Sequence, residues 1–312
     1  MADALAAQGR ERTRLTIGGD APGYTARLPI RDIDVLYVSP HPDDAVFSAG
    51  AAIARDVRER RAVTVVTIFD DTAVDPARRR EEDERAIATL GAERVSLGVA
   101  EAPARDPRLA RPRHLLAPID EQSPFVNDIA QMLKPLVNRA HAVIAPLGVG
   151  EHADHQVAHA ACERVTEPRA LSFYEDLPYA FAEFSLGRRL ARLGGSAPLA
   201  PRGSRLEELR AAWRWWSSLP LLDEEIPFRA ARPFALAVLA RNSARPIATP
   251  AKSIEWKSAT VDVGNFLDDQ LAAIACYATQ WPLFFRTLDE WRSALAARVH
   301  FRLFRRLLES AP

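Results

Sequence analysis

The chain has 312 residues, of which 48% are hydrophobic, so it can bury a substantial core. Its 41 basic and 41 acidic residues balance, and this neutrality argues against a nucleic-acid partner or an anionic membrane surface. Residues 1–20 lack the apolar centre of a signal peptide, and no uncharged apolar run approaches the roughly 18 residues of a membrane span, so we expect a cytoplasmic protein with no integral membrane association.

Strand and helix patterns alternate through the first half of the chain. Residues 1–30 are polar and irregular and are expected to form a tail or strap. The expected strands are 34–38, 62–69, 94–97, 141–146 and 170–174, and the expected helices are 44–60, 76–90, 124–139 and one that ends near 165. This alternation predicts an α/β core over residues 31–176, with a Rossmann-like parallel sheet flanked by helices on both faces.

The alternation breaks down after residue 176. Helical periodicity is expected over 182–193, 204–217, 267–280 and 287–309, and Phe234–Ala240 has the pattern of a strand. The basic end of the last segment, residues 300–309, favours a surface helix over a helix lying on a membrane. We therefore expect residues 177–312 to form a mixed C-terminal part of the same domain, helical with at least one strand.

A first group of reactive side chains directly follows the first expected strand. Ser39 and Pro40 end that strand, and His41, Asp43 and Asp44 come next, where a helix begins. At the carboxyl end of a strand in a parallel sheet, such a turn lies where these folds bind ligands. Alone, the turn could equally be a helix start, because aspartate is a favoured N-cap and suits the helix dipole.

A second group follows the strand expected at 141–146. His152 and His155 lie three residues apart at the start of a helix, and Asp154 lies between them. Alone, these histidines would be read as solvated residues at a helix start. Because parallel strands bring their carboxyl ends to one edge of the sheet, the two groups can meet in space. Two such groups at strand ends therefore indicate one site.

Together the two groups have the composition of a catalytic metal centre. His41, Asp44 and His155 would supply two neutral nitrogens and one carboxylate, and a catalytic zinc commonly takes three such ligands and keeps a fourth position for water. Asp43 could then act as the general base. His152 could polarise the substrate carbonyl or stabilise the oxyanion. Zn²⁺ is the expected cofactor, and Fe²⁺ or Co²⁺ could occupy the same ligands.

These residues resemble the motifs of the zinc-dependent N-acetylglucosaminyl-phosphatidylinositol deacetylases, the PIG-L or LmbE-like family. The family's Ala-His-Pro-Asp-Asp-Glu motif is similar to residues 40–45, and its His-x-Asp-His motif is similar to residues 152–155. The resemblance covers roughly residues 33–176. It implies the same three metal ligands, Asp43 as the base, and an electrophilic or acid role for His152. Asp154 is expected to contact the metal ligands without binding the metal itself.

A third family element, Arg-x-x-Glu-x-x-x-Ala-x-x-x-Leu-Gly, is similar to residues 79–91. The resemblance implies that Arg79 faces the site, either to contact substrate or to orient Asp43. The alternative is a surface arginine beside Arg78 and Arg80.

The sequence departs from the family pattern at two positions. Ala45 replaces the usual glutamate, and this form is more similar to deacetylases that tailor antibiotic sugars, such as those of glycopeptide pseudoaglycones, than to those acting on lipid or mycothiol precursors. Gly150 stands where some relatives carry an active-site tyrosine. Residues 173–181 are similar to a rim loop of the antibiotic subgroup, where Glu175, Asp176 and Tyr179 could touch substrate or pack at the strand end.

We therefore expect a zinc-dependent N-deacetylase that removes an acetyl or other N-acyl group from an amino sugar or sugar-like small molecule in antibiotic biosynthesis. Specificity is expected to lie in the loop 101–118 and after residue 176. One alternative is an amide hydrolase acting on a non-sugar N-acyl conjugate. Another is a non-catalytic ligand-binding Rossmann-like module, although the first turn lacks a Gly-x-Gly-x-x-Gly fingerprint.

Overall fold

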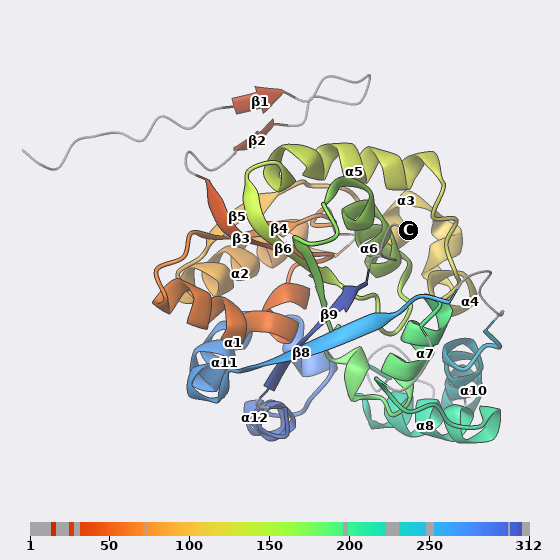
Figure 1. Ribbon diagram of the computed structural model, residues 1–312. Helices are drawn as coiled ribbons and strands as arrows, with labels where there is room; N and C mark the ends of the chain where they lie inside the picture. The colour runs from red at the N-terminus through yellow and green to blue at the C-terminus, as the bar shows by residue number, and fades with distance from the viewer. Residues whose placement is uncertain are drawn as a thin grey trace, which may run out of the picture.

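A seven-stranded sheet forms the centre of the structure, with helices packed against both faces (Figure 1). The computed structural model describes residues 14–16, 25–27, 32–72, 74–195, 199–222, 231–247, 253–298 and 300–307. Within the segment expected as a tail or strap, β1 (Arg14–Thr16) and β2 (Thr25–Arg27) pair antiparallel as a separate small sheet. This architecture confirms the predicted α/β class.

The order of the strands in the large sheet is β5-β4-β3-β6-β7-β9-β8. The strands from β5 to β7 are parallel to their neighbours, whereas β9 pairs antiparallel with both β7 and β8. After β3 the chain adds β4 and β5 on one side of β3, and then adds β6 on its other side. The carboxyl ends of β3 and β6 therefore flank a topological switch point, where such folds bind ligands. The bounds are β3 (Ile33–Ser39), β4 (Val63–Thr67), β5 (Glu93–Ser96), β6 (Ala140–Pro146), β7 (Leu171–Tyr174), β8 (Trp256–Asp262) and β9 (His300–Arg306).

The helices form two layers around the sheet. One layer contains α1 (Asp44–Arg58), α2 (Pro76–Thr89) and α11 (Leu267–Ile274), and the other contains α5 (Pro124–Val137) and α6 (Ala153–Val165) (Figure 1). None of the described helices is long and apolar enough to cross a membrane. The remaining helices are α3 (Ala102–Arg105), α4 (Pro112–Leu115), α7 (Ser185–Arg192), α8 (Arg205–Ser218), α10 (Arg232–Ser243) and α12 (Leu288–Ala296), with the 3₁₀ turns η1 (Pro107–Ala110), η2 (Tyr179–Phe181), η4 (Gly264–Phe266) and η5 (Trp281–Leu283).

Two predictions for the C-terminal part are wrong, in opposite directions. Residues 234–240, expected as a strand, lie within helix α10, where a proline in the first turn and several alanines favour the helix. A short apolar run cannot by itself separate a buried helix from a strand. Residues 300–306, expected as helix, form β9, because pairing with β7 and β8 and burial of Phe304 outweigh local periodicity.

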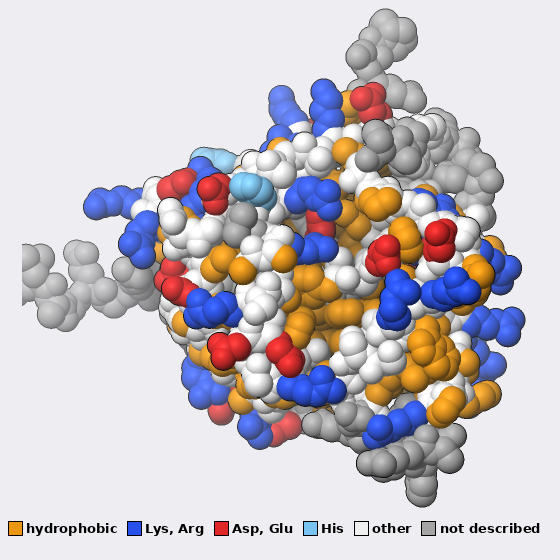
Figure 2. Space-filling view, turned by 90° about the horizontal axis from the view of Figure 1, so that it is seen from below, with side chains coloured by type: hydrophobic (Ala, Val, Ile, Leu, Met, Phe, Trp, Pro, Cys, Tyr) orange, Lys and Arg blue, Asp and Glu red, His pale blue; other side chains and the backbone are white. Residues whose placement is uncertain are grey.

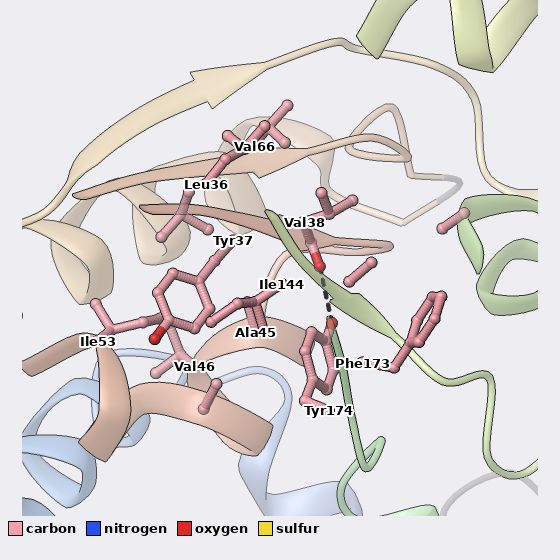
Figure 3. Close-up of a cluster of buried hydrophobic side chains, with 14 of the residues drawn as sticks. Leu36, Tyr37, Val38, Ala45, Val46, Ile53, Val66, Ile144, Phe173 and Tyr174 are labelled. Carbon is pink, nitrogen blue, oxygen red and sulfur yellow. Dashed lines mark hydrogen bonds between the residues drawn. The ribbon is translucent and has the colours of Figure 1, made fainter. Parts of the chain in front are cut away.

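The buried core ties together the strand ends that carry the site. Buried side chains from β3, β4, β6 and β7 belong to one hydrophobic core with residues at the start of α1, among them Ala45 and Val46 (Figure 3). The hydroxyl of Tyr174 on β7 donates to the carbonyl of Val38 on β3 at 2.9 Å, as the dashed line in Figure 3 shows. Because His41 follows β3 and Asp176 follows β7, this bond fixes the spacing of two turns that meet at the site.

Candidate active site

The turn after β3 is held rigidly by its own side chains. The Ser39 hydroxyl donates to the carbonyl of His41 at 2.6 Å and accepts the Ala45 amide at 3.0 Å. The Asp44 carboxylate accepts the His41 amide at 2.9 Å. Asp43 takes a φ of 111°, a value that residues other than glycine rarely adopt. Such strain persists where the surrounding structure holds it, and it commonly marks a functional turn.

The Asp176 carboxylate binds the backbone of the loop before α6. Asp176 accepts the amides of Gly148 and Val149 at 2.7 and 2.8 Å. Gly148 and Gly150 both have positive φ, as does Glu151, so this loop turns sharply before it reaches His152. The loop thus presents His152 at the N-cap of α6, with His155 one turn later.

The two groups meet, as the sequence predicted. One ring nitrogen from each of His41, His152 and His155 can be chosen so that all three lie within 4.8 Å of one another. One Asp44 carboxylate oxygen lies 3.0 Å from Nδ1 of His41 and 3.2 Å from Nε2 of His155. Four groups capable of binding a metal therefore converge where the ends of β3 and β6 lie side by side.

His155 has the arrangement expected of a metal ligand. Its Nδ1 lies 2.7 Å from the Asp176 carboxylate, which fixes the ring and favours a proton on Nδ1. Its Nε2 is buried and makes no hydrogen bond with any described residue. An imidazole held in this way leaves Nε2, 3.2 Å from the Asp44 carboxylate, as the nitrogen that would bind a metal. The residues present therefore fit a divalent cation at this point.

The electrostatics of the site also favour a cation. Burial alone would lower the pKa of His41, but hydrogen bonds with Asp154 and Asp44 raise it to about 9. Burial is likewise outweighed at His155, where the Asp44 charge and a hydrogen bond with Asp176 raise the pKa to about 10. The surrounding carboxylates thus stabilise positive charge where a metal ion would bind.

His152 differs from the other two histidines. Burial, and then the charge of His41, lower its pKa to about 3, so the ring is neutral. Its Nδ1 accepts the Asp154 amide at 3.3 Å, which leaves the proton on Nε2. A neutral ring with an Nε2–H group is a hydrogen-bond donor and a poor metal ligand, so Asp44 suits the third ligand position better than His152.

Asp43 directly precedes helix α1 and lies beside the proposed metal ligands. Burial, and then the neighbouring Asp44 charge, raise the pKa of Asp43 above its usual range, which makes it a stronger base. A guanidinium nitrogen of Arg79 lies 3.6 Å from the Asp43 carboxylate and donates to the Pro42 carbonyl at 3.3 Å. The other terminal nitrogen of Arg79 lies 3.6 Å from Glu101. Arg79 thus lies against the base, in the orienting position considered above.

Asp154 lies against Nε2 of His41, whereas Asp44 lies against Nδ1 of the same ring. Asp154 is fully buried, and one of its oxygens lies 2.9 Å from Nε2 of His41. Arg105, which the sequence did not single out, donates to its other oxygen at 2.6 Å. Arg105 is one of several arginines in this loop, and a single sequence does not show which of them contacts Asp154. This contact could therefore not be predicted.

In the rim loop after β7, the contacts agree with the second of the two alternatives, packing at the strand end. Glu175 forms ion pairs with Arg298 and Arg302, and both Asp176 oxygens are bound within the site, so neither is directed at a substrate. Tyr179 packs its ring edge-on against His155, with centroids 5.6 Å apart. A Cβ added to Gly150 would lie 2.6 Å from Cγ of Tyr179, so the glycine makes room for this ring.

Comparison with known proteins agrees with the geometry. The PIG-L family, described as GlcNAc-PI de-N-acetylase, matches residues 36–166, a span that holds both motifs. The 2'-N-acetylparomamine deacetylase of Streptomyces fradiae is 34% identical over 180 residues, which cover 51% of this chain and 62% of that enzyme, so the similarity spans less than two thirds of the relative's length.

Solved structures of antibiotic deacetylases share the fold. The A40926 pseudoaglycone deacetylase Dbv21 has a TM-score of 0.51 at 20% identity and covers 90% of this chain and 100% of its own. A structure described as the zinc inhibited form of teicoplanin deacetylase Orf2 has a TM-score of 0.54 at 18% identity, with 89% of this chain and 100% of its own covered. The family resemblance inferred from the motifs is confirmed by these comparisons.

Proposed function

We propose that this chain, whose residues 36–166 match the PIG-L family, is a metal-dependent amide hydrolase that removes an N-acetyl group from an amino sugar or a similar small molecule. The observation that carries the proposal is the convergence of His41, Asp44 and His155. One Asp44 oxygen lies 3.0 Å from Nδ1 of His41 and 3.2 Å from Nε2 of His155, and Asp43 is the adjacent residue.

We assign the metal ligands as His41, Asp44 and His155. Two imidazoles and one carboxylate favour Zn²⁺, although Fe²⁺ or Co²⁺ suits the same donors. A divalent metal bound there would lower the pKa of a bound water and polarise the amide carbonyl. Metal titrations should extend beyond one equivalent, because one solved neighbour is described as a zinc inhibited form.

The chain's own residues supply the proton transfers. Asp43 accepts the proton of the attacking water and returns it to the amide nitrogen as the C–N bond breaks, which releases acetate and a free amine. Arg79 keeps the Asp43 carboxylate in place through their 3.6 Å contact. The Nε2–H of neutral His152 donates to the oxyanion that develops at the carbonyl oxygen of the amide.

The substrate assignment draws on the similar enzymes. The Streptomyces fradiae relative is a deacetylase of 2'-N-acetylparomamine, which supports an N-acetylated amino-sugar intermediate of antibiotic biosynthesis here. A cytoplasmic location stays a prediction from the sequence.

Acetate release tests the reaction and the substrate class together. The metal-loaded protein is incubated with N-acetylglucosamine-bearing compounds, with N-acetylated aminoglycoside precursors and with N-acetyl amides that carry no sugar. The proposal predicts acetate from the first two groups, loss of activity with a chelator, and recovery on adding metal. Acetate from the non-sugar amides alone would instead favour a general amide hydrolase, and the absence of both metal binding and acetate would favour a ligand-binding module.

A further inference from the structure

Helix α3 lies in the loop expected to carry specificity. It donates two hydrogen bonds to Asp154, the carboxylate that contacts His41. The backbone amide of Ala102 donates to Oδ2 of Asp154 at 2.8 Å, and Nη2 of Arg105 donates to Oδ1 at 2.6 Å. The same Oδ2 lies 2.9 Å from Nε2 of His41. Asp154 is fully buried, so these partners replace the water that an exposed carboxylate would bind.

Arg105 is itself fixed in place. Its guanidinium carbon lies 4.8 Å from the ring centroid of Phe69 and 4.4 Å from that of Phe125. Its Nη1 donates to the carbonyl of Ala100 at 2.6 Å. A planar guanidinium can stack on rings while it donates from two nitrogens, and lysine cannot reproduce this combination.

We propose that Arg105 is a positioning residue of the metal centre, which acts on His41 through Asp154. This inference rests on the proposed metal-binding function. A carboxylate that accepts the N–H of a ligating imidazole fixes the ring and increases its basicity, and Arg105 fixes that carboxylate. Without Arg105, the buried Asp154 carboxylate loses a charged partner at 2.6 Å and is no longer held against His41.

The loop also reaches the other side of the site. Glu101, one residue before α3, lies 3.6 Å from Arg79, whose guanidinium contacts Asp43. One short segment therefore reaches both sides of the site. Its Arg105 contacts Asp154, the partner of His41, and its Glu101 contacts Arg79, the partner of Asp43. The position of α3 therefore affects both the proposed metal ligand His41 and the proposed base Asp43.

The test is the metal affinity of Arg105 variants, measured with Co²⁺ by competition against a chelator. Arg105→Gln removes the charge and, because its side chain is shorter, withdraws the donors from both Asp154 and Ala100, so we expect about 10- to 100-fold weaker binding. Arg105→Lys keeps the charge and should fall between Arg105→Gln and wild type. Arg108→Gln is the matched control, because Arg108 lies in the same loop, its side chain is 81% exposed, and it pairs with Asp106.

Two further readings separate positioning from general destabilisation. The visible spectrum of the Co²⁺-loaded Arg105→Gln protein should change if His41 is displaced, and the metal-induced rise in Tm should shrink relative to wild type. If Arg105→Gln does not fold, the same measurements on Arg105→Lys decide the question. Wild-type affinity and an unchanged spectrum in the folded Arg105 variants would overturn this inference, whereas failure of the wild-type protein to bind metal would overturn the proposed function instead.

Discussion

Nδ1 of His155 lies 2.7 Å from one oxygen of Asp176, and the other Asp176 oxygen accepts the amides of Gly148 and Val149. One carboxylate therefore orients a proposed metal ligand and shapes the loop that presents His152. The second motif of the site therefore depends on a residue that lies outside it.

Replacing Asp176 should weaken metal binding. In Asp176→Asn a single acceptor oxygen must serve either His155 or the two loop amides, so one set faces an NH₂ group. We expect the metal affinity to fall by about 10- to 100-fold, measured by competition with a chelator. Glu167→Gln, at an exposed carboxylate, is the control and should bind metal as the wild type does. Equal affinities in both variants would show that Asp176 does not orient the ligand.

The role of His152 can be separated from metal ligation. If its Nε2–H stabilises the oxyanion, His152→Ala should lower kcat by about 10²- to 10³-fold while the metal content stays at the wild-type value. His141→Ala provides a control, because the His141 side chain is 74% exposed. Loss of metal from His152→Ala would mean that this histidine, and not only Asp44, belongs to the ligand set.

Gly150 is expected to be intolerant of any side chain. Gly150→Ala combines a φ of +87° with a Cβ placed 2.6 Å from Cγ of Tyr179, so the ring that packs on His155 must move. Gly91→Ala has a similar φ of +76°, but its Cβ would meet Cγ1 of Val57 at 3.0 Å, away from the site. Both variants should lose roughly 1–2 kcal/mol of stability from the backbone alone. Only Gly150→Ala should also lose deacetylase activity, and equal activity in the two variants would contradict the contact with Tyr179.

Two phenylalanines test the two C-terminal elements whose predicted secondary structure is wrong, helix α10 and strand β9. Phe304 in β9 is 0% exposed, whereas Phe234 in α10 is 76% exposed. Phe304→Ala should reduce the free energy of unfolding by about 3–5 kcal/mol. Phe234→Ala should change it by no more than about 0.5 kcal/mol. Denaturant unfolding of both variants measures the difference, and similar losses would contradict the pairing of β9 inside the sheet.

The parallel core could be predicted because each of its elements carries a local signal. The apolar runs at β3, β4 and β6 are long and β-branched, and the polar turns after β3 and β6 contain residue types that chemistry requires. The rule that parallel strands share one carboxyl edge then brought His41 and His155 together without any structure.

The rest of the site depends on contacts that no local pattern records. Asp176 lies alone after a short strand, and Arg105 is one arginine among several in its loop, so only the folded chain shows that they hold His155 and Asp154. The same limit applies to β9, whose Phe301 and Phe304 are spaced like a helix stripe, although the strand is fixed by its neighbours.

The central claim is that two adjacent aspartates do different work, with Asp44 binding metal and Asp43 moving protons. The most direct test measures metal content and acetate release on the same preparations of wild type, Asp43→Asn and Asp44→Asn. We predict about one metal ion per chain in wild type and Asp43→Asn, and little metal in Asp44→Asn. Turnover in Asp43→Asn should fall by about 10²- to 10⁴-fold despite its bound metal. Near-normal turnover in Asp43→Asn, or full metal content in Asp44→Asn, would contradict this division of roles.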